Sequence, residues 1–288
     1  HYICFTFLSC NCMSPISANV SVVIIGNGIS GITCARQLRK QSNCRITVIS
    51  GETKHFFSRT ALMYIYMGHL KYEHTKPYED WFWEKNRIEL VYNHVTAVDP
   101  VAHKLTFADG TEMGYDKLVI AAGSKPNKFG WPGQDLKGAQ GLYSYPDLEL
   151  MEANTRHGVT HAVITGGGLI GVEMAEMLHS RGIGVTFLVR EKNFWGNVLP
   201  PEEAQLVNRE IRKQGIDLRL ESELKEICAG ADGRVAAVIT TAGEKINCQF
   251  VGLTAGVSPN ISFLEKSGIA CDRGRTLQVF GNLLGNAL

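Results

Sequence analysis

The order of apolar and polar positions near the start of the chain predicts a strand, a helix and a second strand. The β-branched run 20–25 predicts a buried parallel strand, since strands covered on both faces are continuously apolar. Apolar residues then recur at helical spacing, and residues 45–50 form a second apolar run. This order is typical of a βαβ unit, in which the helix connects two parallel strands.

The same order returns about 140 residues later in the chain. An apolar run at 161–165 is followed by a helical stretch that ends at His179 and by a strand pattern at 185–189. Repetition of a whole supersecondary unit indicates an internal duplication. The sequence therefore predicts an α/β protein with two Rossmann-like dinucleotide-binding folds.

Shorter strand patterns follow each predicted βαβ unit and are separated by turn residues. They occur at 95–99, 104–107 and 118–121 in the first half, and at 217–220, 235–240 and 250–255 in the second. We interpret them as β-meanders with strands that complete each sheet. Each predicted domain then has three layers, with a parallel sheet in the middle.

A glycine-rich stretch connects strand to helix in both predicted units, at 26–31 and at 166–171. In a G-x-G-x-x-G turn, the first glycine allows the sharp turn, the second lets a diphosphate approach, and the third allows close helix packing. The diphosphate then lies at the helix N-terminus, where free N–H groups and the helix dipole stabilise it. Glu52 and Glu191 lie about 20 residues further on, where an acid binds ribose hydroxyls.

Composition and charge exclude several other classes of protein. The 288 residues include 29 Lys and Arg against 28 Asp and Glu, and this balance gives no basic surface for nucleic acid. No apolar run is long enough to predict a transmembrane segment. The eight cysteines have no C-x-x-C spacing, which favours reduced thiols and a cytoplasmic location. The nine histidines show no metal-ligand spacing, so we predict no metal site.

Two further motifs stand in the order expected of one known family. Residues 115–124 (YDKLVIAAGS) and 253–260 (LTAGVSPN) accompany the two glycine turns, and together the chain resembles the pyridine nucleotide–disulfide oxidoreductase superfamily. The resemblance implies FAD in the first fold and NAD(P)H in the second. It implies an FAD-binding domain at 14–128 and 251–288, an NAD(P)-binding domain at 129–250, and a stub at 1–13 that is non-native or disordered.

The resemblance also implies which residues bind each cofactor. For FAD these are the turn residues, the ribose acid, an adenine contact and residues beside the flavin: Gly26, Gly28, Ile29, Ser30, Gly31, Glu52, Arg59, Val95, Ala122 and Gly123. For NAD(P)H they are Gly166, Gly168, Leu169, Ile170, Gly171, Val189, Arg190 and Gly256, with Glu173 positioning the nicotinamide. Relatives place their FAD ribose acid one position earlier, where this chain has Gly51.

Arg59 indicates the branch of the superfamily. Members with thiol chemistry have a cysteine at this position, and thiolates are needed for disulfide exchange. Arginine here resembles the nitrite reductase NAD(P)H-binding subunits and the ferredoxin and rubredoxin reductases. The predicted enzyme therefore passes hydride from NAD(P)H to flavin, and then electrons to a small redox protein or small molecule, without a redox-active disulfide.

Some alternatives remain open at this stage. Val189 and Arg190 favour NADPH and Glu191 favours NADH, so coenzyme choice stays undecided. Type II NADH:quinone oxidoreductases share the double fold, and an inactive nucleotide-binding fragment is the non-enzyme reading. Residues 274–280 resemble the lead-in to the family's second FAD segment, and no Gly-Asp follows before Leu288. We therefore expect a C-terminally truncated chain.

Overall fold

The computed structural model describes residues 18–269, which form two compact units. Unit 1 contains the described residues up to Arg59, then Tyr72–Ser124, and the described residues from Pro259 onward. Unit 2 contains Thr60–Lys71 and Lys125–Ser258. Neither unit is a single continuous stretch of chain.

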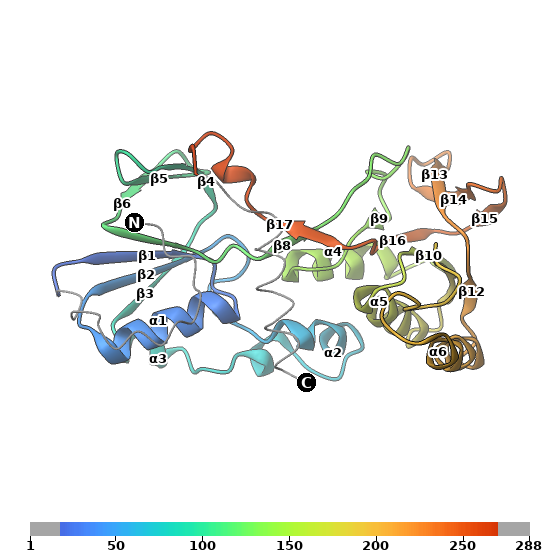
Figure 1. Cartoon of the computed structure of the whole chain (residues 1–288), viewed down its shortest axis with the longest axis horizontal. Helices are drawn as coiled ribbons and strands as arrows, with labels where there is room; N and C mark the ends of the chain where they lie inside the picture. The colour runs from blue at the N-terminus through green and yellow to red at the C-terminus, as the bar shows by residue number, and fades with distance from the viewer. Residues whose placement is uncertain (1–17, 270–288) are drawn as a thin grey trace. The chain divides into compact units, whose positions relative to one another are not determined.

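A four-stranded parallel sheet forms the centre of unit 1 (Figure 1). Its order is β3 (Ile88–Tyr92), β2 (Arg45–Ser50), β1 (Ser21–Ile25) and β7 (Lys117–Ile120). The helix α1 (Ile29–Gln41) connects β1 to β2, which are neighbours in the sheet. This is the βαβ unit that the hydrophobic pattern predicts.

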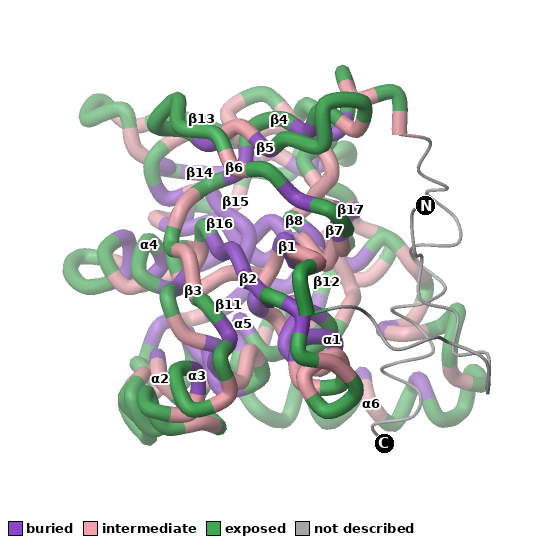
Figure 2. Tube along the Cα trace, turned by 90° about the vertical axis from the view of Figure 1, so that its left-hand side faces the viewer, coloured by how far each residue is buried: buried purple, intermediate pink, exposed green. Residues whose placement is uncertain are grey.

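Two hydrophobic clusters cover the two faces of this sheet, because successive strand residues point to opposite sides. Val22 and Ile24 pack on the side of α1 and of α3 (Trp81–Lys85). Val23 and Ile25 pack on the side of an antiparallel meander. The meander strands are β4 (Val95–Asp99), β5 (Lys104–Phe107) and β6 (Glu112–Gly114). Figure 2 shows the buried positions in purple.

Unit 2 repeats this arrangement around a five-stranded parallel sheet. The order is β12 (Asp217–Arg219), β11 (Gly184–Leu188), β10 (His161–Thr165), β16 (Phe250–Leu253) and β9 (Ala139–Gln140). Its antiparallel meander is β13 (Leu224–Ala229), β14 (Val235–Thr240) and β15 (Lys245–Asn247), which packs on Val163 and Val251 of the sheet. The predicted three-layer α/β architecture with meanders is confirmed.

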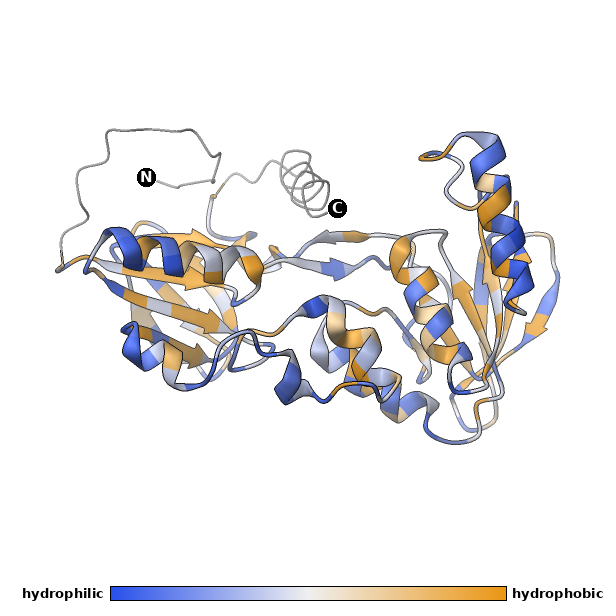
Figure 3. Ribbon diagram, turned by 90° about the horizontal axis from the view of Figure 1, so that it is seen from below, coloured by the Kyte–Doolittle hydropathy of each residue, from blue (hydrophilic) through white to orange (hydrophobic). Residues whose placement is uncertain are grey.

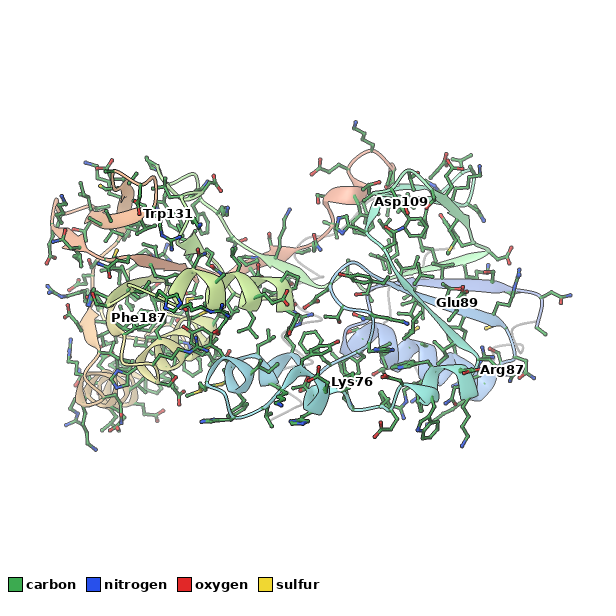
Figure 4. All side chains as sticks on the ribbon, turned by 180° about the vertical axis from the view of Figure 1, so that it is seen from behind. Lys76, Arg87, Glu89, Asp109, Trp131 and Phe187 are labelled. Carbon is green, nitrogen blue, oxygen red and sulfur yellow. The ribbon has the colours of Figure 1, made fainter. Side chains whose placement is uncertain are left out.

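The longer helices of unit 2 are α4 (Tyr145–Thr155), α5 (Leu169–His179) and α6 (Pro201–Lys213). Met174 of α5 packs over Gly252, where a side chain on β16 would meet its sulfur at 2.3 Å. The helix α6 is amphipathic, with Ala204, Asn208 and Ile211 buried and charged residues on its other faces (Figure 3). Phe187 of β11 is fully buried (Figure 4).

The remaining elements are short. They are η1 (Arg59–Ala61), α2 (Leu62–Tyr66), η2 (Tyr72–Thr75), η3 (Ser262–Leu264), and a two-stranded sheet of β8 (Ser124–Pro126) and β17 (Val257–Pro259). The chain passes between the units at both strands of this sheet.

The unit boundaries differ from the expected domain limits. Residues Thr60–Lys71 belong to unit 2, although they lie inside the expected FAD-binding segment 14–128. The physical reason is the buried side chain of Tyr66, whose ring lies 3.6 Å from the guanidinium carbon of Arg181. The Tyr66 hydroxyl also hydrogen-bonds with Thr155 Oγ1 at 2.7 Å. These contacts join α2 to α4 and to the end of α5.

The other boundaries also shift. The crossings fall after Ser124 and after Ser258 rather than after residues 128 and 250. The predicted stub at 1–13 and the lead-in segment at 274–280 lie outside the described residues.

Candidate dinucleotide-binding sites

The glycine turn of unit 1 is closely packed at its first and third glycines. The amide of Gly26 donates to Ile49 O at 2.8 Å, and its φ of +109° favours glycine. A Cβ on Gly26 would lie 2.0 Å from Ala121 O. A Cβ on Gly31 would lie 1.9 Å from Gly26 O. Both positions exclude side chains, Gly26 because the backbone after β7 lies against it and Gly31 because α1 packs directly on the turn that precedes it.

The second glycine of this turn is open. Gly28 is the N-cap of α1, makes no side-chain cap hydrogen bond, and has no atom within 4 Å of a Cβ built on it. Ile29 and Ser30 beside it are exposed, and Ile29 keeps 67% of its surface accessible. Space in front of a helix N-terminus is what a diphosphate needs, because the first amides of the helix have no partner within it.

A buried amide supports the turn and was not predicted from the sequence. Asn27 donates from Nδ2 to the backbone oxygen of Thr53 at 2.7 Å. The Ser50 hydroxyl accepts hydrogen bonds from the amides of Glu52 and Thr53 at 3.2 and 3.3 Å. The glycine turn and the loop after β2 are thereby held together. The polar Asn27 between two glycines was the one signal available in the sequence.

Two of the predicted FAD residues form an ion pair. Arg59 donates from Nη1 to Glu52 Oε1 at 2.9 Å and from Nη2 to Glu52 Oε2 at 2.7 Å. The Arg59 guanidinium also lies over the Phe57 ring at 5.5 Å. A bidentate pair fixes the plane of the carboxylate. Glu52 is thus held at the carboxyl end of β2, and its contact with the adenosine ribose stays a prediction.

The structure also explains why the acid is displaced by one position from Gly51. A Cβ on Gly51 would lie 2.7 Å from Nδ1 of His94 and 3.3 Å from its Cβ. The imidazole therefore occupies the space that a side chain at position 51 needs.

Removal of the Arg59 guanidinium is expected to weaken FAD binding about tenfold, roughly 1.4 kcal/mol. In Arg59→Ala the Glu52 carboxylate loses its fixed orientation, although its charge stays. The dissociation constant of FAD, measured by fluorescence titration, checks this. Lys104→Ala removes an exposed ion pair with Glu112 in the same unit and is the matched control, with no change expected. Equal FAD affinity in Arg59→Ala and the control would show that the ion pair has no part in the site.

The other predicted FAD residues occupy two places in unit 1. Val95 is buried as the first residue of β4 in the meander-side core. Ala122 and Gly123 follow the end of β7, beside the first glycine turn. Gly123 has a φ of +68°, and its backbone oxygen accepts from the Asn260 amide at 2.9 Å. Their contacts with adenine and flavin stay predictions.

The glycine turn of unit 2 resembles that of unit 1: its first and third glycines have no room for a side chain, and its second glycine does. A Cβ on Gly166, whose φ is +114°, would lie 2.6 Å from Thr254 O. A Cβ on Gly171 would lie 2.6 Å from Gly166 O and 2.8 Å from Phe187 Cζ. Gly168, the N-cap of α5, has nothing nearer than Thr254 O at 4.0 Å, and Leu169 beside it is 56% exposed.

Thr254 is a second supporting residue that sequence reasoning did not assign. Its hydroxyl is buried and donates to Thr165 O at 3.0 Å, with Gly166 O at 3.2 Å. It therefore holds the end of β10 where the glycine turn begins. Gly256, two residues further, has a φ of +93° and accepts from the Asn127 amide at 3.0 Å.

The two repeats can be aligned by backbone hydrogen bonds. Gly26 donates to Ile49 O in unit 1, and Gly166 donates to Leu188 O in unit 2. Ser50 is therefore equivalent to Val189, Gly51 to Arg190, and Glu52 to Glu191. Val189 is fully buried, and Arg190 is exposed and paired with Glu191.

Glu173 lies on α5, with Ile170 half-buried one turn earlier. Its side chain has exposed surface, but the surrounding protein and the neighbouring charge of Glu176 raise the pKa of the Glu173 carboxyl. Its predicted role beside the nicotinamide stays a prediction.

The cysteines of the described residues make no disulfide. Burial raises the pKa of the Cys34 thiol to about 11 and that of Cys248 to about 12. These two thiols are protonated at neutral pH and are therefore weak nucleophiles. Between residues 18 and 269 no group of three potential metal ligands occurs. No helix in this described part has the length and apolar character needed to span a membrane.

The fold and the two turns define a protein with two dinucleotide-binding units. A family model described as pyridine nucleotide-disulphide oxidoreductase matches residues 20–283, and the chain belongs to this family. The chain is 28% identical over 257 residues to a nitrite reductase [NAD(P)H] of Bacillus subtilis, covering 88% of this chain and 31% of that protein.

Two further comparisons agree with this placement. The chain is 28% identical to the ferredoxin--NAD(+) reductase subunit of a benzene 1,2-dioxygenase system of Pseudomonas putida, over 88% of this chain and 62% of that protein. A ferredoxin reductase of Rhodopseudomonas palustris has the same fold, with a TM-score of 0.80 and 24% identity over 88% of this chain and 63% of that one. The chain thus spans about one third to two thirds of the length of these relatives.

Proposed function

We propose that this chain carries the two nucleotide-binding units of an FAD-dependent NAD(P)H oxidoreductase. The observation that supports this most directly is the paired geometry of the glycine turns. In each unit the outer glycines are closed by backbone oxygens at 2.6 Å or less, and the middle glycine faces open space. That combination suits a diphosphate at a helix N-terminus and gives little advantage to a purely structural turn.

The residues present fit both cofactors. In unit 1 the amides after Gly28 bind the diphosphate of FAD, and Glu52, oriented by Arg59, binds the adenosine ribose. In unit 2 the amides after Gly168 bind the diphosphate of NAD(P)H. FAD held at this site would supply a hydride acceptor and a carrier of electrons to a further acceptor. The protein contributes orientation and proximity.

The acceptor of the electrons is a small redox protein or a small molecule. This follows the relatives, which include a nitrite reductase and a ferredoxin--NAD(+) reductase subunit. A route through protein thiols is disfavoured in the described residues, because Arg59 stands at the family's cysteine position and the buried thiols of Cys34 and Cys248 stay protonated.

A visible absorption spectrum of the purified chain tests the proposal. We expect a flavin band near ~450 nm that bleaches under anaerobic conditions when NADH or NADPH is added. Re-oxidation by ferricyanide, a general electron acceptor, should restore the band. A colourless chain that does not take up added FAD but still binds pyridine nucleotide would instead support the nucleotide-binding fragment. A flavoprotein that neither coenzyme reduces would contradict the assignment of unit 2.

A further inference from the structure

The coenzyme preference of unit 2 depends on the residues that follow β11. This question rests on the proposed function, because it concerns the adenosine end of the nucleotide bound at Gly168. In dinucleotide-binding folds, an acid after the second strand accepts both ribose hydroxyls of NAD and repels a 2′-phosphate. A cation at the same edge accommodates the 2′-phosphate of NADP.

Val189 occupies the position directly after β11, with its side chain against the glycine turn. It is fully buried, and its Cγ1 lies 3.0 Å from where a Cβ on Gly167 would stand. Its amide donates to Arg219 O, and its oxygen accepts from the Ser222 amide. The side chain is therefore fixed in place, and its methyl groups accept no hydrogen bond from a ribose hydroxyl. The first residue after the strand thus gives NADH no specific partner.

Arg190 is the next residue and points to solvent, with 73% of its side chain accessible. Its guanidinium donates to Glu191 Oε1 from Nε at 3.3 Å and from Nη2 at 3.1 Å. The pair is between adjacent residues and exposed, so it is weak. A phosphate dianion offers more charge and several acceptor oxygens to the same planar donors. It therefore competes well with the Glu191 carboxylate.

Glu191 stands in the register of Glu52 of unit 1, but its surroundings differ. Glu52 is oriented by Arg59, a residue seven positions away that fixes both carboxylate oxygens. Glu191 is engaged through one oxygen by its neighbour Arg190. The residue directly before the acid is Gly51 in unit 1 and Arg190 in unit 2. In unit 1 the cation beside the acid is Arg59, which binds both carboxylate oxygens, whereas in unit 2 it is the exposed Arg190.

We infer that Arg190 binds the 2′-phosphate of the coenzyme and that unit 2 selects NADPH over NADH. Val189 leaves the first position after β11 without an acid, and the Glu191 carboxylate stays paired with the guanidinium of Arg190 until the phosphate displaces it. Arg190 thus determines the choice between NADPH and NADH and takes no part in the hydride transfer itself.

Equilibrium binding of NADP⁺ and NAD⁺ to the whole chain, measured by isothermal titration calorimetry, tests this inference. The unmodified protein is expected to bind NADP⁺ at least about tenfold more tightly than NAD⁺, with a preference that falls as salt rises. Arg190→Ala should remove this preference by weakening NADP⁺ alone. Val189→Asp should shift it toward NAD⁺. Glu191→Gln should strengthen NADP⁺ binding, an effect that a purely structural ion pair would not produce.

Lys213→Ala is the matched control, since it removes an exposed cation at the last residue of α6, where Lys213 pairs with Glu210. It should leave both affinities unchanged. Equal affinities for the two nucleotides, or tighter binding of NAD⁺, would overturn the selection of NADPH and leave the proposed function standing. Binding of neither nucleotide would instead contradict the assignment of unit 2 itself.

Discussion

Gly28→Val is expected to lower the affinity of the chain for FAD by at least about 100-fold, or roughly 2.7 kcal/mol. The valine side chain would fill the space in front of α1 that the diphosphate needs. The fold should tolerate it, because the backbone of Gly28 is extended (φ −69°, ψ −178°) and nothing lies within 4 Å of its Cβ. Loss of a good N-cap residue costs about 1 kcal/mol. Flavin content and thermal unfolding, measured on the same sample, check both expectations.

Gly168→Val is the counterpart in unit 2 and makes the test specific. Its backbone is also extended (φ −101°, ψ 177°), and its nearest neighbour is 4.0 Å away. This variant should keep the flavin band and lose bleaching by NAD(P)H. Gly28→Val should show the reverse, with pyridine nucleotide still bound and the flavin absent. If both variants retained both nucleotides, the two turns would not be the binding sites.

Gly31→Ala should instead destabilise unit 1 itself. The added methyl group would lie 1.9 Å from Gly26 O. It would be attached to the backbone of α1, and Gly26 is held by its hydrogen bond to Ile49 O, so neither side can easily move away. Overpacking of this kind costs about 3 kcal/mol, which corresponds to a fall of roughly 6–12 °C in the unfolding midpoint. Differential scanning calorimetry without added FAD measures this effect independently of cofactor binding.

Gly114→Ala is a suitable control for that experiment. Gly114 lies in β6 of the same unit, and its nearest neighbour would be 3.9 Å from the new Cβ. Its substitution should change the stability by about 0.5 kcal/mol or less. An equally small effect of Gly31→Ala would mean that α1 can move away from the turn, contrary to the tight packing at that position.

The parts of the fold that follow from local pattern were predictable from the sequence. Continuous β-branched runs specify the strands at 20–25 and 161–165, because only buried parallel strands are apolar on both faces. The glycine spacing at 26–31 specifies a turn whose backbone cannot carry side chains at two positions. Strand ends differ from prediction by one or two residues, since the start of a turn depends on hydrogen bonds rather than on residue type.

The features that escaped prediction depend on contacts between distant residues. The assignment of Thr60–Lys71 to unit 2 follows from Tyr66 and Arg181, which are 115 positions apart in the sequence. The pairing of Glu52 with Arg59 needs the fold of the intervening loop, although each residue was singled out separately. The lack of room for a side chain at Gly51 comes from His94, which lies in the loop between β3 and β4. Periodicity carries no information on any of these.

The excursion of Thr60–Lys71 has a practical consequence for anyone who wishes to isolate a single nucleotide-binding module. No single cut in the sequence separates the two units, because the chain passes from one unit to the other after Arg59, Lys71, Ser124 and Ser258. An expression fragment that starts at Lys125 would lack α2 and expose the surface around Thr155 and Arg181 that Tyr66 covers. A stable fragment of unit 2 must therefore include residues 60–71 as well as 125–258, for example joined to each other by a linker.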